Sequence, residues 1–394
     1  MVTLNPFILL ILIPGGWDTT MVFDSKLDSS YVTPEAGAQH AYGASKISYV
    51  DHPDRKSVRK WFESYGNNAA IINGLYTGSI SRQRAIVKSL STIPPEKHKP
   101  VDWLTFYAAS LNPTLLAPHF VIDSPYFPGH LGSTVISMTS KKIKNLAERL
   151  PTADSAASAK IASSIERFRR NELAKFSANV AEGTLDGDKY ASIYSSAIRN
   201  FALEKAVQQI GNSLNVDPSE SSFLTAGKFA LDMFSGGYSI CATISHKDPS
   251  YWETYENHFQ SQSALFESLF SDLLKIMDHG SKKGILPATL IILMSERGRS
   301  PKLNKNLGKG SWPYSSMLLW GPGIKGGTVS GKTDPFLRGI PIDPIFGAAG
   351  VPDAIILEPA NVFAGLFTKF NIPTKLLVPN IKPLSTIIEI KDLM

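Results

Sequence analysis

The chain has almost no cysteine and no apolar run long enough to cross a membrane. Cys241 is the only cysteine among 394 residues, so neither a disulfide nor a cysteine-rich zinc site can form within one chain. Its apolar surroundings, residues 238–244, indicate a buried thiol. The N-terminal run PFILLILIP, residues 6–14, is too short for a membrane span and lacks the basic flank and cleavage site of a signal peptide. It reads as a first buried strand, and a cytoplasmic location is the simplest expectation.

Long runs of one charge are also missing. The 40 basic and 34 acidic residues are scattered along the chain and give a formal net charge of +6. No pattern of a nucleic-acid-binding module is present. The mild positive balance is compatible with a small anionic ligand, although an ordinary solvated surface explains it as well.

Short apolar runs without alternation recur along the chain, and each ends near Gly, Ser or Asp. Such runs are typical of strands buried on both faces of a parallel sheet. Helical spacings lie between several of them, for example in residues 58–65 and in residues 257–279, where Gly280 is the expected stop. The sequence therefore predicts a single doubly wound α/β domain over residues 1–394 with a mostly parallel sheet. The expected strands are residues 7–13, 69–72, 119–122, 134–138, 238–244, 290–294 and 317–320.

The composition changes between about residues 140 and 230. Ala, Ser, Lys and Glu dominate there, strand signals are absent, and the apolar residues follow helical spacings. This indicates a helical insertion within the domain, which could offer a surface to a protein partner. After Thr333 the chain becomes rich in proline and glycine, with one further helix expected near residues 362–370.

Residues that directly follow the apolar runs are the site candidates, because ligands bind beyond the carboxyl ends of the strands in such sheets. Asp18 follows a Gly15–Gly16 turn, and Glu296 follows the run 290–294. Carboxylates at these places can hold a divalent metal ion. Alternatively, Asp18 caps a turn and Glu296 pairs with a neighbouring arginine.

Hydroxyl groups and an arginine follow the run 69–72. Thr77, Ser79 and Arg82 stand where a helix is expected to begin. Free backbone amides at a helix N-terminus and a nearby guanidinium both favour a phosphate or sulfate group. The hydroxyls could equally be helix caps.

In this order, these segments resemble the alkaline-phosphatase/sulfatase superfamily, and most closely a bacterial sulfatase-like family known as domain of unknown function 1501. The resemblance covers roughly residues 7–327 and rests on the joint pattern. It implies a sheet of the alkaline-phosphatase/sulfatase type and a two-metal site acting on phosphate or sulfate esters. The matching segments are the GG-x-D turn at 15–18, His-Pro at 52–53, the W-D-T-H-G-N motif at 252–257, the M-S-E-F-G-R-T motif at 294–300 and the glycine-rich end at 321–327.

The chain departs from that family at the positions of the metal ligands. Glu253 and Tyr255 replace the Asp and His of W-D-T-H, and Gly310 and Ser311 replace a later Asp-His pair. No histidine follows His279. A standard two-zinc site is therefore not expected. Aligning the sulfatase motif C/S-x-P-S-R places Gly78 at the nucleophile, so that Thr77 or Ser79 would have to act instead.

Three hypotheses for the function stay open. The first is a metal-dependent hydrolase of phosphate or sulfate esters, with Thr77, Ser79 and Arg82 as catalytic residues. Its metal ligands would be Asp18, Glu253 and Glu296, holding Mg, Mn, Ca or Zn; the nearby His246, Asp248, Glu256 and His258 are further candidate ligands.

The second hypothesis is a non-catalytic pseudoenzyme. In it, Arg82, Arg297 and Arg299 replace the charge of the metal and bind an anion without catalysis, or the pocket binds a protein partner. The third is a purely structural or assembly role.

Overall fold

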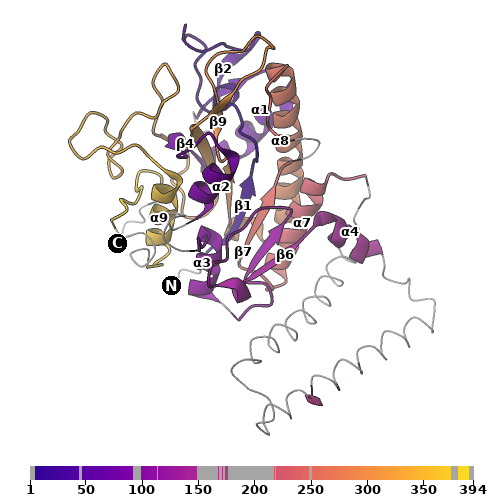
Figure 1. Cartoon of the computed structure of the whole chain (residues 1–394). Helices are drawn as coiled ribbons and strands as arrows, with labels where there is room; N and C mark the ends of the chain where they lie inside the picture. Colours follow the sequence, from indigo (N-terminus) through magenta and orange to yellow (C-terminus); the bar gives the residue numbers. More distant parts are fainter. Residues whose placement is uncertain are drawn as a thin grey trace.

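The computed structural model describes residues 5–43, 47–91, 99–112, 114–148, 219–247, 251–373 and 380–389, with a few single positions between 149 and 218. Within this part of the chain the apolar runs form an eight-stranded sheet in the order β12-β4-β11-β8-β1-β7-β5-β6. Figure 1 labels β1, β4, β6 and β7 of this sheet. The strands are β1 (Phe7–Leu12), β4 (Ala69–Tyr76), β5 (His119–Ile122), β6 (Val135–Met138), β7 (Cys241–Ser245), β8 (Thr289–Met294), β11 (Tyr314–Trp320) and β12 (Thr328–Ser330).

The sheet is parallel apart from one strand. β1 lies between β7 and β8 and is parallel to both, and β5 is parallel to β6 and β7. β11 runs antiparallel to both of its neighbours, β4 and β8. All seven runs expected to be strands are strands, which confirms the predicted α/β class and the mostly parallel sheet. The carboxyl ends of β1, β4 and β8 and the start of β11 meet at one edge of the sheet.

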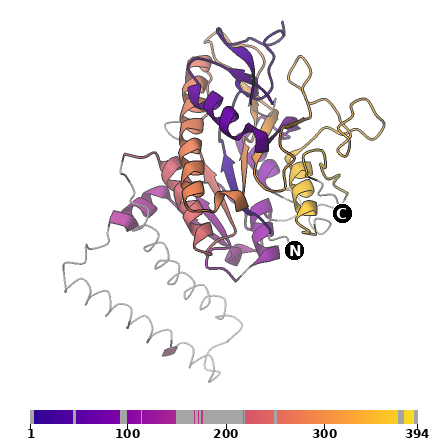
Figure 2. The same cartoon turned by 180° about the vertical axis from the view of Figure 1, so that it is seen from behind.

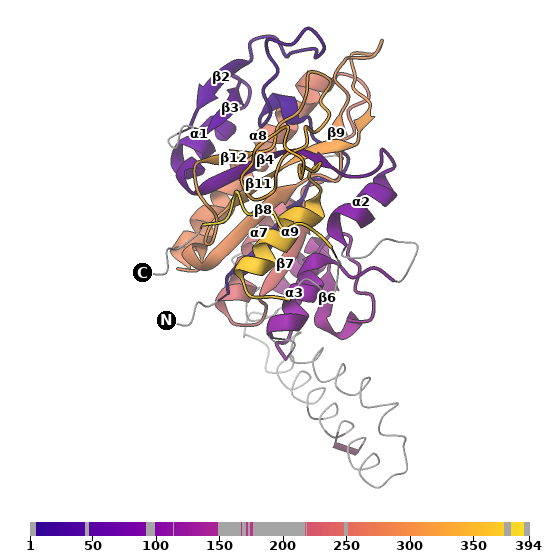
Figure 3. The same cartoon turned by 90° about the vertical axis from the view of Figure 1, so that its left-hand side faces the viewer.

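Helices cover both faces of the sheet, as Figures 2 and 3 show from two further sides. Leu9 and Ile11 of β1 belong to a core with α1 (Lys56–Tyr65), α7 (Ser222–Ser235) and α8 (His258–Lys282). Ile8 and Leu10 belong to the opposite core, with α2 (Arg82–Leu90), α3 (Trp103–Leu111) and α9 (Pro359–Lys369). Burial on both faces explains why β1 is apolar throughout. The buried, free Cys241 lies in the second core, as predicted.

α8 is longer than predicted, because it continues through Gly280 to Lys282. A Cβ atom on Gly280 would lie 3.0 Å from a methyl group of Leu231 and 3.4 Å from Leu286. This glycine thus allows α7 and the chain after α8 to approach closely, and the expectation that it ends the helix was wrong.

The smaller elements lie around this framework. Of the predicted insertion at 140–230, the structure describes α4 (Ser140–Glu148) and α7, and α7 packs against α8 in the core. Most of 149–216 lies outside the described residues, so the insertion stays a prediction.

Among the helices that the structure describes, none is both long and apolar enough to span a bilayer. The other elements within the described ranges are β2 (Gln39–Tyr42), β3 (Ser48–Asp51), β9 (Gly298–Arg299), β10 (Ser311–Trp312), η1 (Thr19–Met21), η2 (Gly66–Asn68), η3 (Gly132–Thr134) and η4 (Leu286–Ala288).

Candidate functional site

The turn after β1 places Asp18 at the carboxyl edge of the sheet. Gly15 and Gly16 have φ angles of +115° and +99°, a region that residues with a Cβ atom avoid. A Cβ atom on Gly15 would lie 2.8 Å from the backbone nitrogen of Trp252. Asp18 then caps η1, where its Oδ1 accepts hydrogen bonds from the amide and the hydroxyl of Thr20 at 3.0 and 2.6 Å.

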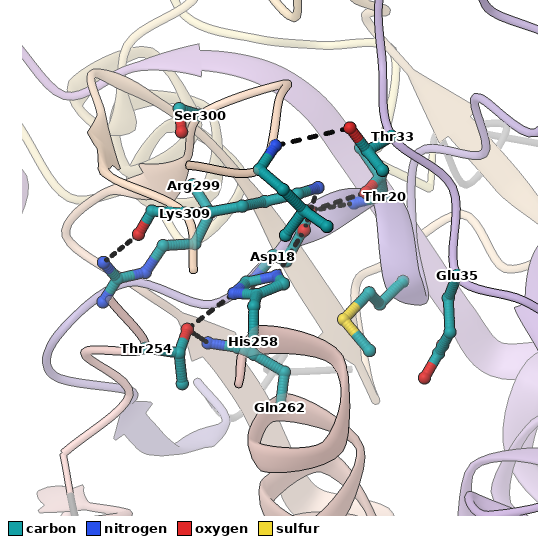
Figure 4. Close-up of polar contacts among 12 residues, drawn as sticks. Asp18, Thr20, Thr33, Glu35, Thr254, His258, Gln262, Arg299, Ser300 and Lys309 are labelled. Carbon is teal, nitrogen blue, oxygen red and sulfur yellow. Dashed lines mark hydrogen bonds and ion pairs between the residues drawn. The ribbon is translucent and has the colours of Figure 1, made fainter. Parts of the chain in front are cut away.

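The second oxygen of Asp18 faces two further side chains (Figure 4). The ammonium group of Lys309 lies 2.7 Å from Oδ2, and Nε2 of His258 lies 2.8 Å from the same atom. All three side chains are fully buried. Three segments far apart in the sequence thus meet at this carboxylate.

The start of α8 holds His258 in place. Its Nδ1 lies 2.7 Å from the hydroxyl of Thr254, which leaves Nε2 to donate to the carboxylate. Burial lowers the pKa of His258 and outweighs the opposing effect of Asp18, so the imidazole is a neutral donor. One turn further along α8, the amide oxygen of Gln262 accepts from the backbone nitrogen of Asp18 at 3.0 Å.

The charge of Asp18 is balanced inside the protein. Burial alone would raise its pKa, but the attraction of Lys309 and the hydrogen bond from His258 outweigh burial and hold the pKa well below its ordinary value. A carboxylate has about four acceptor positions. The amide and hydroxyl of Thr20, His258 and Lys309 fill all four.

The residues at this edge do not fit a divalent metal ion. A metal bound to Asp18 would have to displace the Lys309 ammonium, and an ammonium group 2.7 Å from the carboxylate repels any cation beside it. In the part of the chain that the structure describes, no three His, Cys, Asp or Glu side chains lie together as a possible metal cluster. The ligand roles of Asp18, Glu253 and Glu296 therefore remain a prediction without support from this geometry.

Glu253 and Glu296 meet at Arg297 instead of at a shared ion position. Arg297 donates to Oε1 of Glu253 at 2.5 Å, and its Nε lies 3.4 Å from Oε1 of Glu296. Glu296 also accepts from the backbone nitrogen of Gly15 at 2.9 Å, and burial raises its pKa. Arg297 further donates to the carbonyl of Ile80 and to the hydroxyl of Ser311.

Arg299 binds backbone atoms of the glycine turn. Its guanidinium donates to the carbonyl oxygens of Gly15, Gly16 and Trp252 and is fully buried. It therefore orders the turn that presents Asp18. Arg297 and Arg299 were both expected to bind an anion, but the guanidinium group of each is hydrogen-bonded within the protein.

The expected catalytic residues Thr77, Ser79 and Arg82 follow β4 at the same edge of the sheet. The Thr77 hydroxyl donates to the carbonyl of Pro313 at 3.1 Å, and Ser79 accepts from the backbone nitrogen of Ser81 at 3.0 Å. Arg82 opens α2, with its side chain 32% exposed and 3.9 Å from Glu253. Its guanidinium stacks on the ring of Tyr251, 3.9 Å from the centroid.

The further candidate ligands are not brought together. His246 accepts from the indole nitrogen of Trp252 at 3.1 Å, whereas His258 binds Asp18. Glu256 is exposed, and Asp248 lies outside the described residues.

Sequence reasoning missed Lys309. Lys309 directly precedes Gly310 and Ser311, which replace the family's Asp-His pair, but its partner Asp18 is 291 residues away, so the local sequence did not identify it as a buried residue.

Several solved structures are similar to the chain. A sulfatase from Pseudoalteromonas sp., PsFucS1, is 10% identical, with 97% of this chain and 74% of that chain covered and a TM-score of 0.41. A protein of the alkaline phosphatase superfamily from Vibrio parahaemolyticus is 8% identical, with 97% and 71% covered and a TM-score of 0.42. The lipoteichoic acid synthase LtaP from Listeria monocytogenes is 7% identical, with 96% and 74% covered and a TM-score of 0.41.

At the level of sequence, no curated protein matches the chain. One family model does, that of the proteins of unknown function named DUF1501, and it covers residues 123–343, more than half of the chain. This match confirms the resemblance found in the sequence motifs: the chain belongs to the DUF1501 family.

Proposed function

We propose that this protein binds a phosphate or sulfate group at the N-terminus of α2, with no metal ion and without hydrolysing the ester. The observation that carries the proposal is the position of Arg82 at the first residue of this helix. Ser81 precedes it in an extended conformation and makes no side-chain cap, and no acidic residue stands in the first turn. Uncapped amides and a guanidinium together favour an anion.

The charges around Arg82 support an anionic ligand. Arg82 and Arg297 both approach Glu253, at 3.9 and 2.5 Å, so two guanidinium groups share one carboxylate. Arg82 is the more exposed of the two, since only 4% of the Arg297 side chain is accessible. An arriving anion would therefore meet Arg82 first.

The hydroxyl groups argue for binding without hydrolysis. A nucleophilic Thr or Ser needs a nearby base or metal to remove its proton. Among the described residues, neither a histidine nor a carboxylate is hydrogen-bonded to Thr77 or Ser79; these hydroxyls bind backbone groups of Pro313 and Ser81 instead. The carboxylates that would hold a metal are engaged by Lys309 and Arg297.

Calorimetric titration with inorganic phosphate and, separately, with sulfate at low ionic strength tests the binding. We expect Arg82→Gln to weaken binding about tenfold or more, because a charge-assisted hydrogen bond contributes about 1.5–3 kcal/mol. Arg84→Gln is the matched control, since Arg84 is exposed on the same helix and the charge change is identical. Equal losses in both variants, or no binding by the wild type, would contradict the proposal.

The absence of hydrolysis needs its own assay. Wild-type protein and Thr77→Val are incubated with p-nitrophenyl phosphate and p-nitrophenyl sulfate. Turnover that disappears in Thr77→Val would favour the ester hydrolase over the pseudoenzyme.

A further inference from the structure

The cluster around Asp18 includes a positively charged side chain, that of Lys309. Lys309 lies in the segment that leads into β10, and its backbone nitrogen donates to the carbonyl of Thr254 at 3.0 Å. Its side chain is fully buried, and its ammonium reaches Oδ2 of Asp18 at 2.7 Å. The ring centroid of Phe259 lies 5.4 Å from the same ammonium, a distance at which an aromatic face attracts a cation.

A buried ammonium group is held only by strong partners. Removing a lysine from water costs several kcal/mol, which a paired carboxylate must offset. Here the pairing is one to one: Asp18 supplies one negative charge, Lys309 one positive charge, and the neutral imidazole of His258 completes the coordination of the same oxygen. A monovalent cation fits this charge balance, whereas a divalent ion would leave an excess positive charge in a dry site.

We infer that the position of the Lys309 ammonium, between Asp18 and Phe259, is a monovalent cation site that the chain fills with its own side chain. The family resemblance implies a metal ion, and hence a positive charge, at this edge of the sheet. Here the side chain of Lys309 carries that positive charge instead. Emptying the position should create a binding site for a small primary ammonium ion. This inference does not depend on the proposed anion site at Arg82.

Chemical rescue of Lys309→Ala tests the inference. We expect this variant to be less stable than wild type and to be stabilised by methylammonium chloride, relative to sodium chloride at equal ionic strength. For a single site, a ligand at about ten times its Kd raises the folding equilibrium constant about elevenfold. Wild-type protein, whose site is filled, should not respond, nor should Lys305→Ala, which removes an exposed lysine of the same loop.

Two further variants separate charge from space. Lys309→Met keeps the apolar stem without the charge and leaves no room for methylammonium, so it should be destabilised and not rescued. In the double variant Asp18→Asn with Lys309→Ala the carboxylate is gone, and methylammonium should have no effect. If Lys309→Ala does not fold in buffer alone, recovery of folded protein on refolding in methylammonium is the supporting result.

Three results would overturn the inference. The first is a Lys309→Ala variant that methylammonium neither stabilises nor brings to the folded state. The second is Lys309→Met with wild-type stability, because the charge would then contribute nothing. The third is uptake of one equivalent of Zn²⁺ or Co²⁺ by wild-type protein that Asp18→Asn abolishes, since the position would then belong to a metal.

Discussion

The Nε atom of Arg299 donates a hydrogen bond to the carbonyl oxygen of Gly16 at 2.8 Å. The same guanidinium binds the carbonyls of Gly15 and Trp252, so one planar side chain joins the first turn of the chain to the segment before α8. We predict that Arg299→Lys destabilises the fold, because a single ammonium cannot reproduce this fork. Losing two such bonds should lower the free energy of unfolding by about 3 kcal/mol, measured by urea denaturation.

The control for this prediction is Arg59→Lys. Arg59 also donates two hydrogen bonds, to Asp51, but its side chain is 45% exposed. An exposed ion pair of this kind contributes little to stability, so Arg59→Lys should change the free energy of unfolding far less than Arg299→Lys. If both substitutions lower stability equally, Arg299 does not have the structural role that its contacts indicate.

The Gly15 position should tolerate no side chain. Gly15→Ala would combine a φ of +115° with a Cβ atom 2.8 Å from the nitrogen of Trp252. Gly284→Ala is the matched control, because Gly284 has a φ of +69° and no atom within 4 Å of its would-be Cβ. That control should lose about 1 kcal/mol, the cost of the left-handed conformation, and Gly15→Ala clearly more. Thermal unfolding followed by circular dichroism measures both, and equal shifts would mean that contact with Trp252 is unimportant.

Two helical glycines test the packing of α7 against α8. A Cβ atom on Gly227 would lie 2.3 Å from Cδ1 of Ile276, whereas the nearest atom to one on Gly280 is 3.0 Å away, on Leu231. Gly227→Ala should therefore lose about 1–3 kcal/mol through overpacking. Gly280→Ala should stay within about 1 kcal/mol of wild type, because the gain in helix propensity of about 1 kcal/mol offsets a mild contact. Denaturant unfolding distinguishes the two, and a larger loss for Gly280→Ala than for Gly227→Ala would refute the prediction that the contact at Gly227 is the tighter one.

The central sheet could be predicted because its signal is local. β1 and β8 are buried on both faces, and apart from Thr289 at the start of β8 their sequences are continuous apolar runs that can be read without knowing the partners. The reversed direction of β11 could not be read in this way, since an apolar run does not indicate strand direction. Gly280 was misread for a similar reason: a glycine that ends a helix and one that admits a neighbour look alike in a sequence.

The candidate site was predictable only in part. Asp18, Glu253, Glu296 and the arginines were found because they follow strands or match family motifs. Their partners were not, because the contacts join distant segments: Asp18 to Lys309 across 291 residues and Glu296 to Gly15 across 281. Nothing in the local sequence around Lys309 distinguishes a buried lysine from an exposed one.

A buried histidine in the sheet should make stability depend on pH. His119 is fully buried on β5, with its two ring nitrogens 2.9 Å from the hydroxyls of Thr105 and Thr243. Burial lowers its pKa, and the opposing attraction of Asp102, 3.6 Å away, is weaker. The folded state thus binds this proton less readily than the unfolded state, whose histidine titrates near 6.5.

The stability contribution of neutral His119 should therefore be complete above about pH 6.5 and be lost as the pH falls from there towards the folded-state pKa, by up to about 1.4 kcal/mol per pH unit. His119→Gln can keep hydrogen bonds to the two threonines but cannot be protonated, so its free energy of unfolding should fall less between pH 7 and pH 5 than that of wild type. His40→Gln, at an exposed position on β2, should keep the wild-type slope. Urea denaturation at closely spaced pH values measures these slopes. If wild type and His119→Gln show identical slopes, protonation of His119 does not contribute to the loss of stability at low pH, and the prediction is wrong.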